Sequence, residues 1–143
     1  MAQLTFSTTI NAPVSKVWTT MLDHPTYEAW TKAFAENSTY DGDRTEWSQI
    51  KFHDGTGNGG MLAMIAKNDL HHFISIKHLW EIGPDQEVTY SQVEAFENYS
   101  FTQIDETTTK LDIELTGLPD EYSEMFNEMW PKALVALQEL CEQ

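Results

Sequence analysis

The sequence predicts an α+β fold in which an antiparallel sheet of about six or seven strands curves around a long C-terminal helix. Segments 4–10 and 109–115 alternate apolar and polar residues, as strands with one buried face do. From 120 to 143 the apolar residues recur every three or four positions, as on one side of an α-helix. The strands between are joined by short turns, which allow antiparallel pairing only, because a parallel pair needs a long crossover.

The first strand is followed by two predicted short helices. Asn11-Ala12-Pro13 supplies a capping-type residue and a proline suited to a first helical turn, so the first helix runs to about Leu22. Asp23-His24-Pro25 repeats the start signal, and the second helix places three aromatic residues on one face: Tyr27, Trp30 and Phe34. These two helices should close one end of the sheet.

The middle of the chain is predicted to form strands. They cover residues 46–53, 61–66, 71–82, 98–104 and 109–115. Turns are expected at 41–43, 54–60, 68–69, 83–85 and 105–107, where Gly, Pro, Asn and Asp gather. Segment 61–66 is continuously apolar, which is typical of a strand buried on both faces. Segment 86–96 fits a strand, a loop or a helical turn, and these alternatives stay open.

The C-terminal helix is predicted over 120–143, with Asp120 and Glu121 at the positive end of its dipole. Its apolar stripe consists of Phe126, Met129, Trp130, Ala133, Leu134, Leu137, Leu140 and Cys141. Pro131 lies inside this helix and predicts a bend there, or a break into two helices, because it removes a backbone hydrogen bond.

Composition limits the classes of partner. The 143 residues suit one domain spanning 1–143, and 23 acidic against 8 basic residues give a formal charge of −15. This charge argues against nucleic acid and anionic membranes as partners, since both need clustered positive charge. No apolar run approaches the ~20 residues of a membrane-spanning helix. The single Cys141 and the absence of a leader segment predict a cytoplasmic protein.

The sequence predicts no metal, no cofactor and no catalytic residue. His72 and His78 are six positions apart on one predicted strand, or about 20 Å at ~3.3 Å per residue, so they cannot share an ion. No nucleophile motif occurs, and Cys141 lies on the apolar stripe. The two histidines nevertheless interrupt an apolar face that includes Trp80 and Ile82, where each must find a hydrogen bond from the protein or from a ligand. Glu81, beside Trp80, is a carboxylate for which a perturbed environment is considered.

Several segments resemble a known family. They are Ile10-Asn11-Ala12-Pro13, Val17-Trp18, Leu22, Pro25, Trp30, Trp47, the 97–101 strand with Tyr99, and Trp130 to Leu134 with Leu137. They are similar to the START-like, birch-pollen-allergen superfamily known as SRPBCC, and within it to the branch homologous to the activator of the heat-shock chaperone ATPase. The resemblance implies a helix-grip fold, an antiparallel sheet that grips the C-terminal helix around an apolar cavity.

The resemblance also implies a function in that cavity. We expect a non-enzymatic binder of a small apolar or amphipathic molecule, such as a lipid, sterol or polyketide, acting as a monomer or weak dimer. The expected ligand-binding residues are Trp18, Trp47, Met64, His72, Ile74, Ile76, His78, Tyr99, Phe101, Met129, Trp130 and Leu134. Two alternatives stay open. One is a chaperone-binding, stress-response module that uses the acidic surface, and the other is a cyclase or hydrolase in which His72 or His78 acts as acid or base.

Overall fold

The computed structural model describes residues 2–33, 39–53, 60–82, 88–118 and 123–143. Phe34, the predicted turn at 83–85, most of the one at 54–60, and the predicted helix start at Asp120 lie outside these ranges. So do the side chains of Trp80, Glu81 and Ile82.

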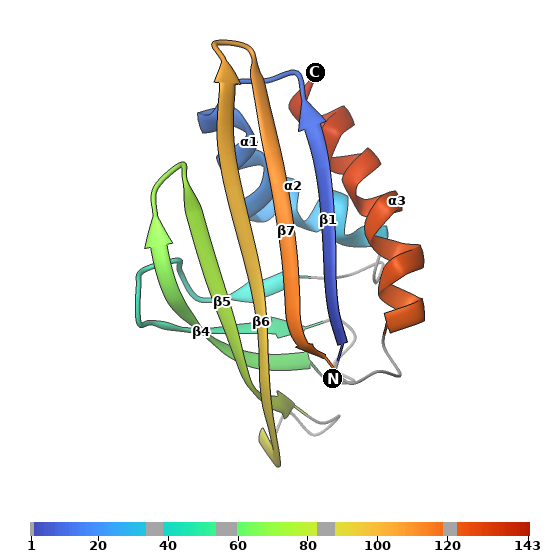
Figure 1. Ribbon diagram of the computed structural model, residues 1–143. Helices are drawn as coiled ribbons and strands as arrows, with labels where there is room; N and C mark the ends of the chain where they lie inside the picture. Colours follow the sequence, from blue (N-terminus) through green and yellow to red (C-terminus); the bar gives the residue numbers. More distant parts are fainter. Residues whose placement is uncertain (1, 34–38, 54–59, 83–87, 119–122) are drawn as a thin grey trace.

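Seven strands form one antiparallel sheet, which confirms the predicted α+β class. They are β1 (Ala2–Ile10), β2 (Thr39–Asp41), β3 (Gln49–His53), β4 (Gly60–Asp69), β5 (Phe73–Ile82), β6 (Val88–Asp105) and β7 (Thr108–Leu118). Their order across the sheet is β1-β7-β6-β5-β4-β3-β2, so the first strand pairs with the last and β2 lies at the opposite edge. Figure 1 shows the long strands β5, β6 and β7 running side by side through the centre of the sheet.

The helices are α1 (Val14–Leu22), α2 (His24–Trp30) and α3 (Ser123–Cys141), with a short 3-10 turn, η1, at Thr31–Ala33. In Figure 1, α1 and α2 lie behind the sheet and α3 runs alongside β1. The C-terminal helix packs against β1, α1 and α2, and its buried residues Trp130, Ala133, Leu134, Leu137 and Cys141 belong to the predicted stripe. The predicted helix-grip arrangement is therefore present.

Pro131 does not break the C-terminal helix. The helix continues from Ser123 to Cys141 with Pro131 inside it. Proline removes the hydrogen bond to the carbonyl four residues earlier, here that of Asn127. Both residues are exposed, so water can satisfy that carbonyl and no second helix is needed.

The inner face of the sheet is built from residues that face each other across neighbouring strands. One row consists of Phe6, Ile113, Tyr99 and Ile74, taken from β1, β7, β6 and β5. The next row consists of Leu4, Leu115, Glu97, Ile76 and Ile65. Because side chains alternate across a strand, directly paired residues share a face, so Glu97 is a single carboxylate in an otherwise apolar row.

Several strand boundaries differ from the predictions. The β4–β5 turn lies at residues 70–72, two positions after the predicted 68–69, and His71 has a φ of 66° in it. Strand β3 begins at Gln49 because the preceding turn includes Trp47, whose φ is 74°. Segment 86–96, which the sequence left open, belongs from Val88 onward to the 18-residue strand β6.

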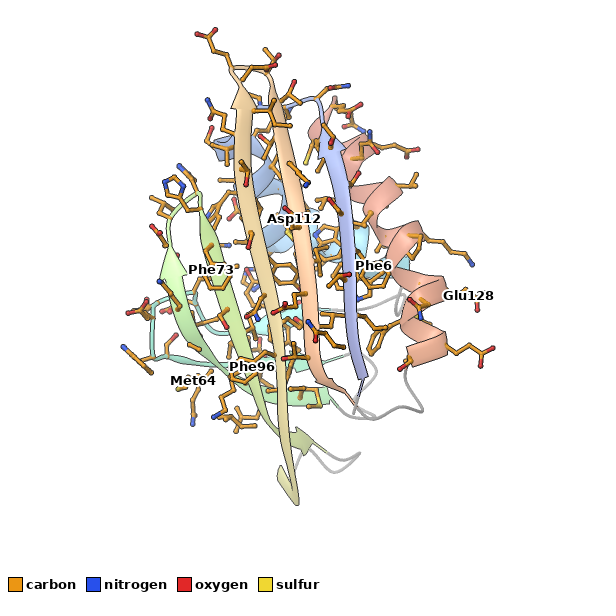
Figure 2. All side chains as sticks on the ribbon, viewed as in Figure 1. Phe6, Met64, Phe73, Phe96, Asp112 and Glu128 are labelled. Atoms are coloured by element: carbon orange, nitrogen blue, oxygen red, sulfur yellow. The ribbon has the colours of Figure 1, made fainter. Side chains whose placement is uncertain are left out.

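Strand β4 is buried on one face and not on both. Ala63 and Ile65 are fully buried, whereas Met64 between them is half-buried on the opposite face, paired with Gln49 and Lys77. Figure 2 shows Met64 with Phe73 and Phe96, all on the face of the sheet turned away from the helices. The alternation predicted through Trp80 is also interrupted, because the pairing shifts register between His78 and Trp80.

Candidate functional site

A cavity of about 210 Å³ lies between the inner face of the sheet, α2 and the first turns of α3. Its described lining is mainly aromatic and aliphatic. The aromatic members are Tyr27, Trp30, Tyr40, Phe52, Tyr99, Phe126 and Trp130. The polar members are Thr31, Arg44, His78 and Glu97. An apolar cavity with a few polar groups is the usual form of a small-molecule site.

Seven of the lining residues form a closed sequence of contacts, which we call the cavity belt. In order, they are Tyr99, Trp130, Trp30, Tyr27, Phe52, His78 and Glu97. Neighbouring ring centroids, from Tyr99 round to His78, are 5.6 to 6.3 Å apart. Glu97 joins the two ends of the series, because its carboxylate contacts both His78 and Tyr99. Five different elements thus supply one continuous wall.

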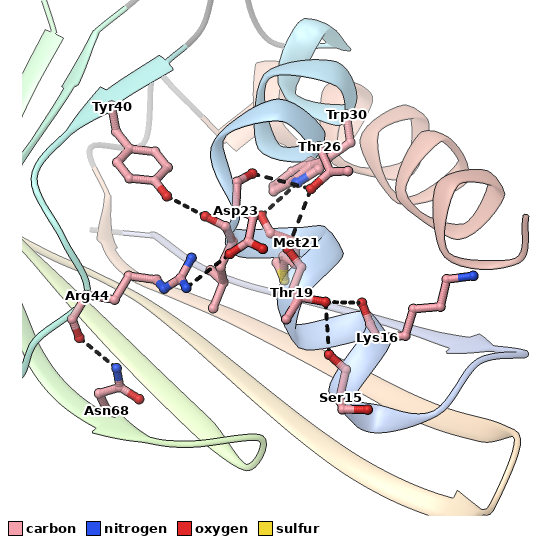
Figure 3. A network of polar contacts seen from close by, with 11 residues as sticks. Ser15, Lys16, Thr19, Met21, Asp23, Thr26, Trp30, Tyr40, Arg44 and Asn68 are labelled. Carbon is pink, nitrogen blue, oxygen red and sulfur yellow. Dashed lines mark hydrogen bonds and ion pairs between the residues drawn. The ribbon is translucent and has the colours of Figure 1, made fainter.

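Hydrogen bonds to the backbone hold several of these rings in place. The indole N–H of Trp30 donates to the carbonyl of Met21 at 2.9 Å, and the hydroxyl of Tyr40 donates to the carbonyl of Leu22. Figure 3 shows Tyr40 and Trp30 anchored in this way beside the end of α1. Since buried indole and phenol groups need such partners, these bonds orient the rings.

The polar part of the belt is the group formed by His78, Glu97 and Tyr99. Nε2 of His78 is 3.5 Å from Oε1 of Glu97, and the Tyr99 hydroxyl donates to Oε2 of Glu97 at 3.0 Å. His78 is 8% exposed, and its Nδ1 is buried without a partner among the described residues. A buried imidazole nitrogen without a hydrogen bond is costly, so a polar ligand atom that reached it would be stabilising.

Ionisation in the belt follows from these contacts. Burial raises the pKa of the Glu97 carboxyl, but His78 nearby and the hydrogen bonds from His78 and Tyr99 outweigh it and hold that pKa below 4.5. Burial, together with the charge of Glu97, raises the pKa of the Tyr27 and Tyr99 phenols. At neutral pH the belt therefore carries an ionised carboxylate next to neutral tyrosines.

Arg44 is the fixed cation of the described lining, and it is already paired. Its Nη2 lies 3.1 Å from Oδ1 of Asp23, which precedes α2 and makes no side-chain cap to that helix. Figure 3 shows this ion pair next to the contact between the Arg44 carbonyl and Asn68. The Arg44 side chain is 28% exposed, so it lies at the boundary between the cavity and solvent.

Five of the twelve sequence-predicted residues line this cavity. They are Ile74, Ile76, His78, Tyr99 and Trp130. Trp18, Phe101 and Leu134 are buried but are not part of its lining. Trp18 and Phe101 contact each other with centroids 5.0 Å apart, and the His71 ring meets Trp18 edge-on at 5.9 Å. These residues are therefore part of the hydrophobic core and not of the cavity wall.

Four predicted wall residues lie elsewhere. Met64 is on the outer face of the sheet, as its pairing requires, and Met129 is half-buried outside the described lining. Trp47 is 68% exposed because its left-handed backbone places it in a turn. His72 is exposed because it belongs to the β4–β5 turn and not to strand β5. A catalytic role in the cavity is thereby removed for His72.

The twelve predicted residues did not include four members of the belt, Tyr27, Trp30, Phe52 and Glu97. Glu97 shares the spacing of Ala95, Tyr99 and Phe101, so a charged residue at an apolar-face position was the available signal. Tyr27 was assigned to a helical face, but the position of α2 against the sheet could not be derived from periodicity.

Among the side chains that the structure describes, no three His, Cys, Asp or Glu residues gather as a metal ion would require. Within the same residues, no helix has both the length and the hydropathy needed to span a membrane.

The fold and the apolar cavity between the sheet and the helices are those of a helix-grip domain of the START-like superfamily. Over residues 11–142 the sequence matches the family described as activator of Hsp90 ATPase homolog 1-like protein. The chain belongs to this family, as the resemblance implied. A comparison with curated proteins gives no significant match.

Solved structures share the fold along almost the entire chain. Protein CV1439 from Chromobacterium violaceum has a TM-score of 0.75 at 14% identity, covering 99% of this chain and 97% of that one. The Aha1 dimer from Colwellia psychrerythraea has a TM-score of 0.72 at 15% identity, with the same coverages of 99% and 97%. CalU16 from Micromonospora echinospora has a TM-score of 0.70 at 16% identity, covering 97% and 75%. At these identities the likeness concerns the fold.

Proposed function

We propose that this protein binds a compact amphipathic molecule inside the cavity, with the polar part of the ligand next to His78 and Glu97. The observation that carries this proposal is a largely apolar space of about 210 Å³ whose wall includes His78, with its buried and unpartnered Nδ1, and the carboxylate of Glu97. A ligand atom that donates to or accepts from this nitrogen would remove the cost of leaving it unpaired.

The volume favours a ligand built on about one aromatic ring. An apolar cavity of ~150 Å³ holds benzene, whereas drug-sized ligands occupy ~300–1,000 Å³. At about 210 Å³ the cavity has room for a ring with a few further atoms. This supports a small aromatic ligand over a sterol or a long-chain lipid.

The test uses indole and oleate as probes. Indole should shift the backbone amide resonances of Ile76, His78 and Glu97, while oleate should leave them unchanged. The variant Ile76→Phe fills the cavity and should abolish the indole shifts, since Ile76 lines the space. Met64→Phe adds the same bulk on the outer face of the sheet and should leave indole binding intact. Failure of indole and related one-ring probes to shift these amides would contradict the proposal.

An enzymatic role is the second candidate, and the His78–Glu97 contact favours it. A carboxylate next to Nε2 can orient the ring, which leaves Nδ1 to move a proton at a bound molecule. With p-nitrophenyl acetate as probe, His78→Gln should lower hydrolysis by at least about a hundredfold. His72→Gln makes the same substitution in an exposed turn and should leave the rate unchanged. Equal rates for the two variants would show that His78 is not catalytic, and its proposed role would then be in binding alone.

Chaperone binding is the third candidate, and the family match favours it. Exposed glutamates lie on α3 at 124, 128 and 139 and just after it at 142, but acidic side chains are also exposed at 41, 43, 46, 105 and 106. This spread does not mark one acidic face. Binding to an Hsp90-type chaperone should be detectable at low salt and weaken as salt screens the surface charges. No complex at low salt would remove this candidate.

A further inference from the structure

The cavity belt has the chemistry of a cation site. Six of its seven members present ring systems, and the seventh is the carboxylate of Glu97. The faces of aromatic rings attract cations through their quadrupole, most strongly where water is excluded. Groups of aromatic rings around one position are the known way in which proteins hold quaternary ammonium ions.

The charge of Glu97 is not neutralised by a fixed cation. Among the described residues its ion-pair partner is His78, and no Lys or Arg lies within ion-pair distance of it. Its second contact, the Tyr99 hydroxyl, is a neutral donor. A carboxylate accepts up to about four hydrogen bonds, so Glu97 retains acceptor capacity for a ligand. Its side chain is 29% exposed, which leaves part of it accessible.

Arg44, the fixed cation of the described lining, would not prevent a cationic ligand from binding next to Glu97. The Arg44 guanidinium is paired with Asp23 at the boundary with solvent. The tyrosines of the belt remain neutral at neutral pH, because burial raises the pKa of Tyr27 and Tyr99. The formal charge of −15 adds a long-range attraction for cations and a repulsion for anions.

We propose that the ligand of this cavity is a compact organic ammonium ion, held between the aromatic faces of the cavity belt with its charge next to Glu97. This inference rests on the proposed function, since it names the chemical class of the cavity ligand. It predicts discrimination by charge among molecules of the same shape.

Three probes with the same number of heavy atoms test it: phenyltrimethylammonium, its neutral isostere tert-butylbenzene, and benzenesulfonate. Binding is measured by tryptophan fluorescence and amide shifts at about 0.15 M salt, where attraction between exposed charges is screened beyond ~8 Å. We expect phenyltrimethylammonium to bind at least about tenfold more tightly than tert-butylbenzene, and benzenesulfonate not to bind.

Two substitutions test whether the preference for phenyltrimethylammonium comes from Glu97. Glu97→Gln should reduce the preference for phenyltrimethylammonium to about threefold or less while keeping the affinity for tert-butylbenzene, which also reports that the cavity is folded. Glu114→Gln removes the same charge from the outer face, where Glu114 accepts from Asn98 and Gln3, and should leave the preference unchanged.

The outcomes separate the two proposals. If tert-butylbenzene binds as tightly as phenyltrimethylammonium, the cavity is a binding site but the cation inference is overturned. The same holds if Glu114→Gln lowers the preference as much as Glu97→Gln does, since the effect would then come from net charge alone. If no probe binds, the proposed function fails together with the inference.

Discussion

Trp30 and Trp47 illustrate how the same residue type serves two different environments. Trp30 is 3% exposed, contacts Tyr27 and Trp130 through its ring and donates its N–H to the Met21 carbonyl. Trp47 is 68% exposed in a turn. The contribution of each to stability should differ accordingly, because buried contacts and buried hydrogen bonds dominate the effects of single substitutions.

We predict that Trp30→Phe lowers the free energy of unfolding by about 2–4 kcal/mol, from lost ring contacts and from the Met21 carbonyl left without this donor. Trp47→Phe should change it by less than about 0.5 kcal/mol. Urea unfolding followed by circular dichroism measures both. Equal effects would show that Trp30 is not a structural anchor of the cavity.

Glu97 predicts a pH dependence of stability. Its pKa in the folded protein is lowered, so its contribution is fully present above the ordinary carboxyl pKa and is lost as the pH falls through the folded value. Compared with Glu97→Gln, the wild-type protein should keep a constant difference in free energy of unfolding from pH 7 to about pH 5. As the pH falls below about 4.3, the ordinary pKa of a glutamate side chain, the difference should shift against the wild type. Urea unfolding at several pH values measures this, and a difference that grows in favour of the wild type on acidification would contradict it.

At the scale of elements, α3 is continuous although it contains Pro131. Proline inside a helix is about 3 kcal/mol less favourable than alanine. The cost is offset by the packing of Trp130, Ala133, Leu134 and Leu137 on the core. Tertiary packing commonly dominates over helix propensity in this way.

We therefore predict that Pro131→Ala raises the free energy of unfolding by up to about 3 kcal/mol, since Pro131 is exposed and the substitution restores a backbone hydrogen bond. Lys132→Ala is the control. It removes an exposed contact of 3.6 Å to Glu128 and should change stability by less than about 0.5 kcal/mol. Thermal and urea unfolding measure both variants. A Pro131→Ala protein no more stable than wild type would mean that packing around this position requires proline.

At the scale of the whole molecule, 23 acidic and 8 basic residues give the folded protein a large net negative charge. Like charges repel more strongly in the compact state than in the extended chain. Raising the salt concentration from about 0.02 M to about 0.2 M should therefore raise the melting temperature, because the Debye length falls well below the molecular diameter.

The predicted increase is a few degrees, measured by calorimetry or circular dichroism. Glu106→Lys, in the exposed β6–β7 turn, should raise the melting temperature at low salt and have a smaller effect at high salt. A melting temperature that falls with added salt would show that specific ion pairs outweigh the general repulsion.

The sequence alone determined the class of fold and the order of most of its elements, although strand β2 and the first part of β6 were not predicted. Alternation in 4–10 and 109–115 and the stripe in 120–143 reflect backbone geometry, which repeats every two residues in a strand and every 3.6 in a helix. Such patterns are local, so they can be read without knowing what lies opposite. The strand pattern in 71–82 and the resemblance to the family also put Ile74, Ile76, His78, Tyr99 and Trp130 among the expected wall residues, and these five line the cavity.

The tertiary structure decided which residues meet in that cavity. Left-handed backbone at Trp47 and His71 moved Trp47 and His72 into turns, and the pairing of β4 moved Met64 to the outer face. Glu97 became a half-buried carboxylate on the inner face of the sheet because β6 aligns it with Leu115 and Ile76. The docking of α2 then brought Tyr27 and Trp30 into the same cavity wall. Register and docking depend on contacts between residues distant in sequence, so no local pattern could specify the chemistry of the site.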